Sequence, residues 1–231
     1  MSRRRGLWCD SLTGEQLRAL SGERTALLQD AQPLWWDRGM TEPYTLLTVC
    51  TGNICRSPAM ERLLAHHLDE EGIRVHSGGT YAHDGEDMQP PMRERVSDYG
   101  ADARNFVADQ LTPQMVRDSD LILTATRVHV EDILADVPEA EDRTFTVREV
   151  GRLLSSVDTD QITEAVGQGA TVADRLAALV PLVAQQRSGA ASAGSEDDVV
   201  DPYMLPSDVY DESFRQLREP IEALVEAVRP S

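Results

Sequence analysis

The segment that most constrains this chain is residues 46–58, which reads LLTVCTGNICRSP. It begins as an apolar run rich in residues that favour β-strands, and the run stops at Cys50. A short loop that contains glycine and asparagine follows, and Ser57-Pro58 then opens a segment with helical apolar spacing. The sequence therefore predicts a strand, a tight loop and a helix in direct succession.

Such a loop is suited to bind an anion. The first turn of the expected helix leaves backbone N–H groups unpaired and presents the positive end of the helix dipole to the loop. Arg56 follows Cys50 closely enough for its guanidinium to fold over the same point and hold a phosphate through two parallel hydrogen bonds. The same field would stabilise a thiolate at Cys50 and make it a nucleophile. Without this strand and helix context, Cys50 would read as a buried cysteine in an ordinary turn.

Charge and composition exclude several classes of function. The 231 residues carry a formal net charge of −18, which argues against nucleic acid or an anionic membrane as a general partner. All 22 cationic residues are Arg, so a Schiff-base lysine and an ATP-type phosphate loop ending in Lys are both excluded. Three Cys, with no pair at zinc-ligand spacing, indicate neither a disulfide framework nor a metal site. No apolar run suits a membrane span or signal core, so we expect a cytoplasmic protein without cofactor.

Residues 49–58, VCTGNICRSP, resemble the signature of the low-molecular-weight protein tyrosine phosphatases almost letter for letter. That family shares its fold with some arsenate reductases. The resemblance implies that Cys50 forms a phosphocysteine, that Arg56 clamps the phosphate and that Ser57 donates a hydroxyl to the thiolate. It also implies that Asn53 braces the loop and that the two cysteines of the loop can form a reversible disulfide. The implied phosphate-binding residues are Thr51, Gly52, Asn53, Ile54, Cys55, Arg56 and Ser57.

A second motif, Asp201-Pro202-Tyr203, lies close to the C-terminus. Proline pushes the preceding residue toward an extended conformation, so Asp201 should project from a defined loop. In the family, a late Asp-Pro-Tyr or Asp-Pro-Phe supplies the general acid, which implies that Asp201 protonates the leaving oxygen and then activates water. Tyr203 would flank the substrate cleft. The opposite wall is expected in the loop after residues 77–80, which resemble the family's SAGT segment, with Tyr81 and His83 as its candidates.

Strand and helix patterns alternate along the rest of the chain. Expected strands lie at 46–50, 73–77, 120–125 and 144–147, and expected helices lie at 60–68, 92–99, 128–134 and 148–154. The last of these helices opens in a way similar to bacterial relatives. This alternation predicts an α/β fold, a three-layer, doubly wound, four-stranded parallel sheet, and the resemblance implies the phosphotyrosine phosphatase I type. Ligands bind at the carboxyl ends of such strands, where Cys50 lies.

Two segments fall outside the resemblance. We expect residues 1–44 to be a helical N-terminal extension and residues 45–231 to be the phosphatase-like domain, with an insert at about 155–198. Within the insert, a helix is expected over 171–185 and a flexible small-residue linker over 188–195. The closing helix over 207–228 should be interrupted or kinked near Pro220. The sequence does not indicate an oligomeric state.

The principal prediction is a metal-independent phosphate monoester hydrolase, acting on phosphotyrosine in protein or on small phosphate monoesters. Two alternatives fit the same loop. One is an arsenate reductase or arsenate-thiol transferase that uses an external thiol, because no Cys follows Cys55. The other is a weakly catalytic module that binds phosphotyrosine or another oxyanion. The second gains support from a departure: many relatives carry Met-Asp where this chain has Ala125-Thr126.

Overall fold

The computed structural model describes residues 42–68, 72–187 and 194–229. The chain divides into two compact units, Met1–Thr41 and Glu42–Ser231. The predicted helix of the N-terminal extension and most of the predicted linker at 188–195 lie outside the described residues. The following description therefore concerns the second unit alone.

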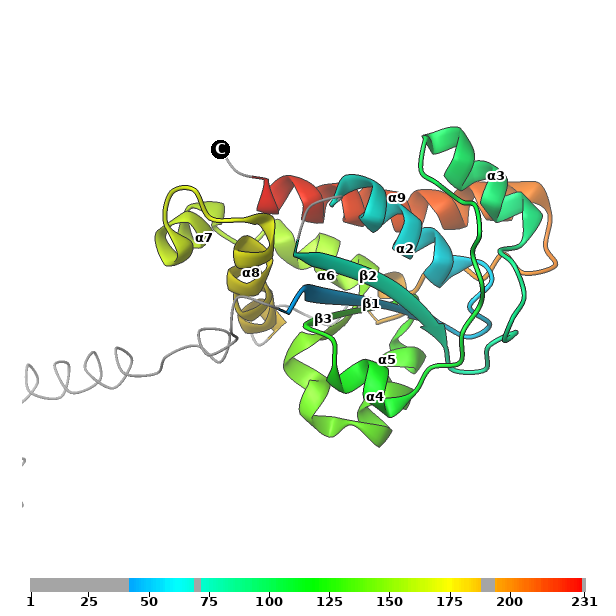
Figure 1. The fold of residues 1–231 in the computed structure, drawn as a ribbon, viewed down its shortest axis with the longest axis horizontal. Coiled ribbons are helices and arrows are strands. Elements are labelled where there is room, and N and C mark those ends of the chain that lie inside the picture. The colour runs from blue at the N-terminus through cyan, green and yellow to red at the C-terminus, as the bar shows by residue number, and fades with distance from the viewer. Residues whose placement is uncertain (1–41, 69–71, 188–193, 230–231) are drawn as a thin grey trace, which may run out of the picture. The chain divides into compact units, whose positions relative to one another are not determined.

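Four parallel strands form one sheet in the order β2-β1-β3-β4 (Figure 1). They are β1 Tyr44–Cys50, β2 Ile73–Gly79, β3 Leu121–Thr124 and β4 Thr144–Thr146. The predicted doubly wound, four-stranded parallel sheet is confirmed. Since the chain order reverses on either side of β1, the crevice at its carboxyl end is the expected ligand site of such a sheet, and Cys50 is the last residue of β1.

Helices cover both faces of the sheet and make three layers (Figure 1). On one side lie α2, α6 and α9, and on the other lie α4 and α5. Alternate residues of β1 serve the two sides: Leu46 and Cys50 belong to the larger apolar core, and Leu47 and Val49 to the smaller one. The helices are α2 Arg56–His67, α3 Pro90–Tyr99, α4 Pro113–Arg117, α5 Arg127–Asp136, α6 Val147–Leu154, α7 Thr159–Val166, α8 Val172–Arg187 and α9 Ser207–Val228. Short 3₁₀ turns occupy η2 Pro138–Arg143 and η3 Gly194–Asp197.

Helix α9 runs through Pro220 as one element, so it is not interrupted there, and the kink that the sequence offered as the alternative stays a prediction. The apolar face that includes Leu217, Ile221 and Leu224 is buried where α9 packs along α2 and α6. This burial outweighs the backbone hydrogen bond that proline removes. The helices approach closely because α6 carries Gly151 at the crossing: a Cβ there would lie 2.6 Å from Cβ of Pro220.

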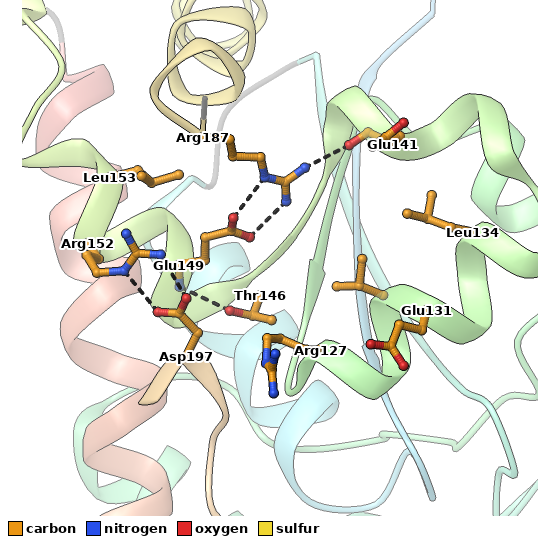
Figure 2. A pocket seen from close by; sticks show the side chains of 11 residues that line it. Arg127, Glu131, Leu134, Glu141, Thr146, Glu149, Arg152, Leu153, Arg187 and Asp197 are labelled. Atoms are coloured by element: carbon orange, nitrogen blue, oxygen red, sulfur yellow. Dashed lines mark hydrogen bonds and ion pairs between the residues drawn. The ribbon is translucent and has the colours of Figure 1, made fainter. Parts of the chain in front are cut away.

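The described part of the insert contains the α-helices α7 and α8, of which sequence patterns predicted α8 but not α7. Arg187, the last residue of α8, lies against the outer strand β4 (Figure 2). Its guanidinium contacts both carboxylate oxygens of Glu149 at 2.8 Å, donates to the Thr144 carbonyl at 2.6 Å and stacks 4.0 Å from the centre of the Phe145 ring. The end of α8 therefore covers the outer edge of the sheet. The charge of the Arg187 guanidinium that lies there is neutralised by Glu149.

None of the helices in the described ranges combines the length and apolar content that a membrane crossing requires.

The crossing of α6 and α9 leads to a stability prediction. Gly151→Ala should lower the free energy of unfolding by about 1–3 kcal/mol, because the added methyl group overlaps the Pro220 ring and forces the helices apart. Urea unfolding followed by circular dichroism measures this change. Ser97→Ala, which installs the same residue on an exposed face of α3, should change stability by less than about 0.5 kcal/mol. Equal stabilities of the two variants would contradict the close-contact interpretation.

Candidate active site

The predicted loop joins the end of β1 to the start of α2. Helix α2 begins at Arg56, one residue before the Ser57-Pro58 pair that was expected to open the helical segment and four before the expected span 60–68. Pro58 is its third residue, where the helix requires no backbone donor. The Cys50 sulfur lies 2.9 Å from the Ser57 hydroxyl oxygen, and both side chains are buried. The nucleophile candidate thus sits beside a hydroxyl group and beneath the N-terminus of a twelve-residue helix.

Asn53 braces the loop from inside. It is fully buried and has a positive φ of 53°, a conformation that asparagine tolerates better than most residues. Its side-chain nitrogen donates to the hydroxyl groups of Ser57 at 2.8 Å and Ser77 at 2.9 Å, and its oxygen accepts from the Asp109 amide at 2.8 Å. Ser77 in turn donates to Glu61, whose pKa is raised by burial. One side chain therefore ties the loop to β2, to α2 and to the segment before α4.

The segment after β2 holds the loop from the other side. A Cβ on Gly79 would lie 2.6 Å from the Thr51 carbonyl oxygen, so the absence of a side chain lets β2 approach the loop. Backbone N–H groups of this segment donate to loop carbonyls: Thr80 to Cys50 (3.0 Å), Tyr81 to Thr51 (2.9 Å), His83 to Gly52 (2.9 Å) and Gln89 to Ile54 (2.8 Å).

The loop amides remain available. Within the described ranges, the N–H groups from Thr51 to Cys55 donate no hydrogen bond to another residue. Because the neighbouring carbonyls are bound from outside, these donors form an unsatisfied group in a largely buried loop. Such a set of amides favours an oxyanion as its partner.

Arg56 and Asp201 meet over this loop. The Arg56 Nη2 atom lies 2.7 Å from Oδ2 of Asp201, and Nη1 donates to the Val199 carbonyl at 3.4 Å. Arg56 is buried, whereas the Asp201 side chain is 53% exposed. The buried Arg56 Nε makes no hydrogen bond to any described residue. A cation with a spare donor and a solvent-accessible carboxylate are therefore brought together, as the two motifs predicted.

The chain segment before Asp201 is fixed to the sheet. The buried carboxylate of Asp197 forms two hydrogen bonds with Arg152 of α6, at 3.1 and 2.8 Å (Figure 2). The side chain of Asp198 accepts from the amide of Arg127 at 2.8 Å, and the amide of Val199 donates to the Ala125 carbonyl at 2.9 Å. These contacts anchor the end of the insert at the carboxyl end of β3, where Asp201 is needed.

His129 is a site residue that sequence reasoning missed. Its Nε2 atom hydrogen-bonds the Thr51 hydroxyl at 3.0 Å, and its Nδ1 atom hydrogen-bonds the Thr126 hydroxyl at 2.7 Å. Burial, followed by the charge of Arg56, lowers the pKa of His129 to about 4, so it is neutral at pH 7. The available signal in the sequence was Thr126, where the chain departs from the family pattern. His129 lies three residues later in the helix, so its side chain returns to the same face as Thr126.

The two loop cysteines are free thiols in different settings. Burial, followed by the charges of Cys50 and Asp201, raises the pKa of Cys55 to about 12. Cys55 therefore remains a neutral thiol at pH 7, which leaves Cys50 as the nucleophile candidate.

The structure brings two of the three cleft candidates together. The rings of His83 and Tyr203 lie next to each other, with their centres 5.7 Å apart and their planes tilted by 58°. Tyr81 is bound to the loop through its backbone, but its side chain is 79% exposed and lines a separate pocket beside α4 and α5. No group of three or more His, Cys, Asp or Glu residues among those described is placed to hold a metal ion.

The bracing role of Asn53 leads to a second stability prediction. Asn53→Ala should lower the free energy of unfolding by about 2–4 kcal/mol, because it removes three hydrogen bonds at a fully buried side chain, those to the Ser57 and Ser77 hydroxyl groups and from the Asp109 amide. Asn105→Ala is the matched control: Asn105 has a similar φ of 55° but is exposed, so it should cost only the backbone strain of about 1 kcal/mol. Chemical denaturation of both variants measures the difference. Similar losses in both would show that the side-chain bonds contribute little.

Comparison with known proteins gives the chain a family. Residues 45–161 match the family model described as low molecular weight phosphotyrosine protein phosphatase. The chain is 37% identical over 101 residues to a probable low molecular weight protein-tyrosine-phosphatase, AmsI, of Erwinia amylovora, a match that covers 44% of this chain and 69% of that protein. It is 32% identical over 118 residues to a protein-arginine-phosphatase of Geobacillus stearothermophilus, covering 51% and 76%.

Solved structures agree with this assignment. The crystal structure of Erwinia amylovora AmsI superimposes with a TM-score of 0.57 at 24% identity, over 83% of this chain and 95% of that one, and shows the shared fold. The YwlE arginine phosphatase of Geobacillus stearothermophilus superimposes with a TM-score of 0.55 at 26% identity, over 80% and 92%. The chain therefore belongs to the low molecular weight phosphotyrosine protein phosphatase family.

Proposed function

We propose that this protein hydrolyses phosphate monoesters, and phosphotyrosine in protein above all, through a phosphocysteine intermediate. One observation carries the proposal. The Cys50 sulfur lies at the base of a loop with free amides, and Arg56 and Asp201 converge on the same loop. The side chains of a single site thus supply a nucleophile (Cys50), a group that holds the anion (Arg56) and a proton donor (Asp201).

In the first step, the Cys50 sulfur attacks phosphorus while the loop amides and Arg56 hold the three equatorial oxygens. Ser57, 2.9 Å from the sulfur, stabilises the thiolate by donating its hydroxyl proton. The entering phosphate takes over the guanidinium that Asp201 occupies in the free protein, and Asp201 is released toward the leaving oxygen. The sulfur–phosphorus bond forms and the phosphorus–oxygen bond breaks, while Asp201, which takes up a proton from solvent once it leaves Arg56, passes that proton to the leaving oxygen.

In the second step, water attacks phosphorus and Asp201 takes one of its protons. The sulfur–phosphorus bond breaks and phosphate leaves, which regenerates the thiolate. The neutral His129 holds the Thr51 hydroxyl throughout and keeps the first turn of the loop in place. Thr126 therefore supports the loop through His129, and the departure from the family pattern at this position gives the binding-module alternative no further support.

The site favours an aryl phosphate. The His83 and Tyr203 rings stand beside each other at the mouth, where they can contact a phenol ring. Phosphoarginine, which the name of the Geobacillus relative suggests as a substrate, is the competitor that a specificity assay must include. Neither the arsenate-transfer nor the binding-module alternative is favoured, because the relatives named above are phosphatases. We further propose a bacterial protein in the cytoplasm, a setting in which thiols such as Cys50 and Cys55 stay reduced.

The test of this function is metal-free hydrolysis of p-nitrophenyl phosphate and of peptides that carry phosphotyrosine or phosphoarginine. Wild type should turn over and prefer phosphotyrosine, Cys50→Ser should be inactive, and Asp201→Asn should lose about 10²-fold or more in kcat. Asp142→Asn, an exposed acid elsewhere, is the control. A reduced wild type that binds phosphate or arsenate but hydrolyses nothing would overturn the proposal.

The anchor of the Asp201 loop leads to a separate prediction. Asp197→Asn should weaken the pair with Arg152 and misplace Asp201, which should lower kcat about tenfold. The loss should be larger with phenyl phosphate than with p-nitrophenyl phosphate, because the poorer leaving group depends more on proton donation. Glu226→Gln, which weakens an exposed pair with Arg229 at the end of α9, is the matched control. Equal losses with both substrates would count against an effect through Asp201.

A further inference from the structure

A pocket of about 320 Å³ lies between the segment after β2 and helices α4 and α5. We call it the side pocket. Its floor is apolar and includes the buried side chains of Val116, Ile133 and Val137. Its rim includes the exposed ring of Tyr81 and two exposed carboxylates, Asp132 and Asp136. No arginine lines it.

Both walls of the side pocket are tied to the phosphate loop. On one wall, the Tyr81 amide donates to the Thr51 carbonyl at 2.9 Å. On the other, Asp132 lies one helical turn after His129, whose Nε2 atom bonds the Thr51 hydroxyl at 3.0 Å. A polypeptide whose phosphorylated residue occupies the loop therefore passes close to the side pocket.

The carboxylates of the side pocket are uncompensated. Asp132 and Asp136 are four residues apart on α5, so they lie on the same face of the helix. Neither forms a hydrogen bond or an ion pair with another residue in the described part of the chain. The neighbouring pocket of Figure 2 differs, since Asp197 and Glu149 already hold its guanidinium groups Arg152 and Arg187. An apolar floor with free negative charge at the rim fits a side chain that has an aliphatic stem and a cationic head.

We propose that the side pocket binds a Lys or Arg side chain of the tyrosine-phosphorylated substrate, close to its phosphotyrosine. The inference rests on the proposed function and adds a sequence preference to it. The stem of the side chain covers Ile133 and Val137, and its charge lies between Asp132 and Asp136. The ring of Tyr81, which is 79% exposed, offers a face to the same cation. The net charge of −18 attracts basic segments of substrate in general, and the side pocket selects where the basic residue must stand.

The test is a peptide scan with one phosphotyrosine in a neutral background. Lys, norleucine or Glu is placed in turn at each position from −3 to +3, and kcat/KM is measured at low and high salt. At one or two positions, Lys should exceed norleucine by about three- to tenfold, the range of one or two exposed ion pairs, and Glu should fall below it. Norleucine has an aliphatic side chain without the charge of Lys, so the ratio of Lys to norleucine measures the contribution of the charge. Added salt should reduce the Lys advantage.

Variants then assign the effect to the side pocket. Asp132→Asn combined with Asp136→Asn should bring the Lys-to-norleucine ratio close to one, and Asp136→Arg should favour Glu. Asp142→Asn combined with Asp160→Asn changes the net charge equally at exposed sites outside the side pocket, and should keep the ratio of wild type. A Lys advantage that survives loss of both side-pocket carboxylates would overturn the inference.

The outcomes separate this inference from the proposed function. Hydrolysis of the neutral phosphotyrosine peptide without a Lys advantage at any position would refute the side pocket and leave the phosphatase activity standing. Absence of hydrolysis with every phosphate ester would refute the proposed function, and the inference would fall with it.

Discussion

The loop after β1 keeps its shape because its carbonyl groups are bound from outside and Asn53 is bound from inside. Among the described residues, the amides from Thr51 to Cys55 donate to no other residue. A buried donor without a partner costs on the order of 1–3 kcal/mol. An oxyanion that satisfies several of these amides at once recovers this free energy. The same contacts therefore explain both the stability of the loop and its affinity for phosphate.

Arg56 and Asp201 form an ion pair beside the loop. Their contact at 2.7 Å neutralises the buried guanidinium. The ion pair is nevertheless weakened by solvent at its Asp201 end, because that carboxylate is half exposed. At the other end, the Arg56 Nε atom has no hydrogen-bond partner among the described residues. A phosphate offers more acceptors than one carboxylate. In the proposed mechanism, exchange of the partner of Arg56 moves Asp201 toward the leaving oxygen, so substrate binding also positions the acid.

Local patterns predicted the strand–loop–helix unit and the alternation of strands and helices, because each depends on neighbours in sequence. The parallel sheet was inferred from that alternation, and the roles of the loop residues were implied by the family resemblance. Contacts between distant segments were not predictable in this way. Pro220 stays within a helix because Gly151, in another helix, leaves room for its ring. His129 reaches Thr51 only once β3 and β1 lie side by side. Similarly, the capping of β4 by Arg187 depends on where α8 packs, which no pattern within α8 reveals.

The anchored end of the insert has a consequence for how the chain can vary. Asp197, Asp198 and Val199 are each bound to residues of the catalytic core, so the position of Asp201 does not depend on the path taken between α6 and Asp197. Lengthening a connection whose ends are fixed costs little, about 0.6 kcal/mol for each doubling of its length. Insertions should therefore be tolerated at the exposed turn 167–169 between α7 and α8, whereas α8 itself contributes Leu176, Leu179 and Val183 to the core and must be kept. The connection that precedes Asp197 can therefore gain new surface residues while Asp201 keeps its position beside Arg56.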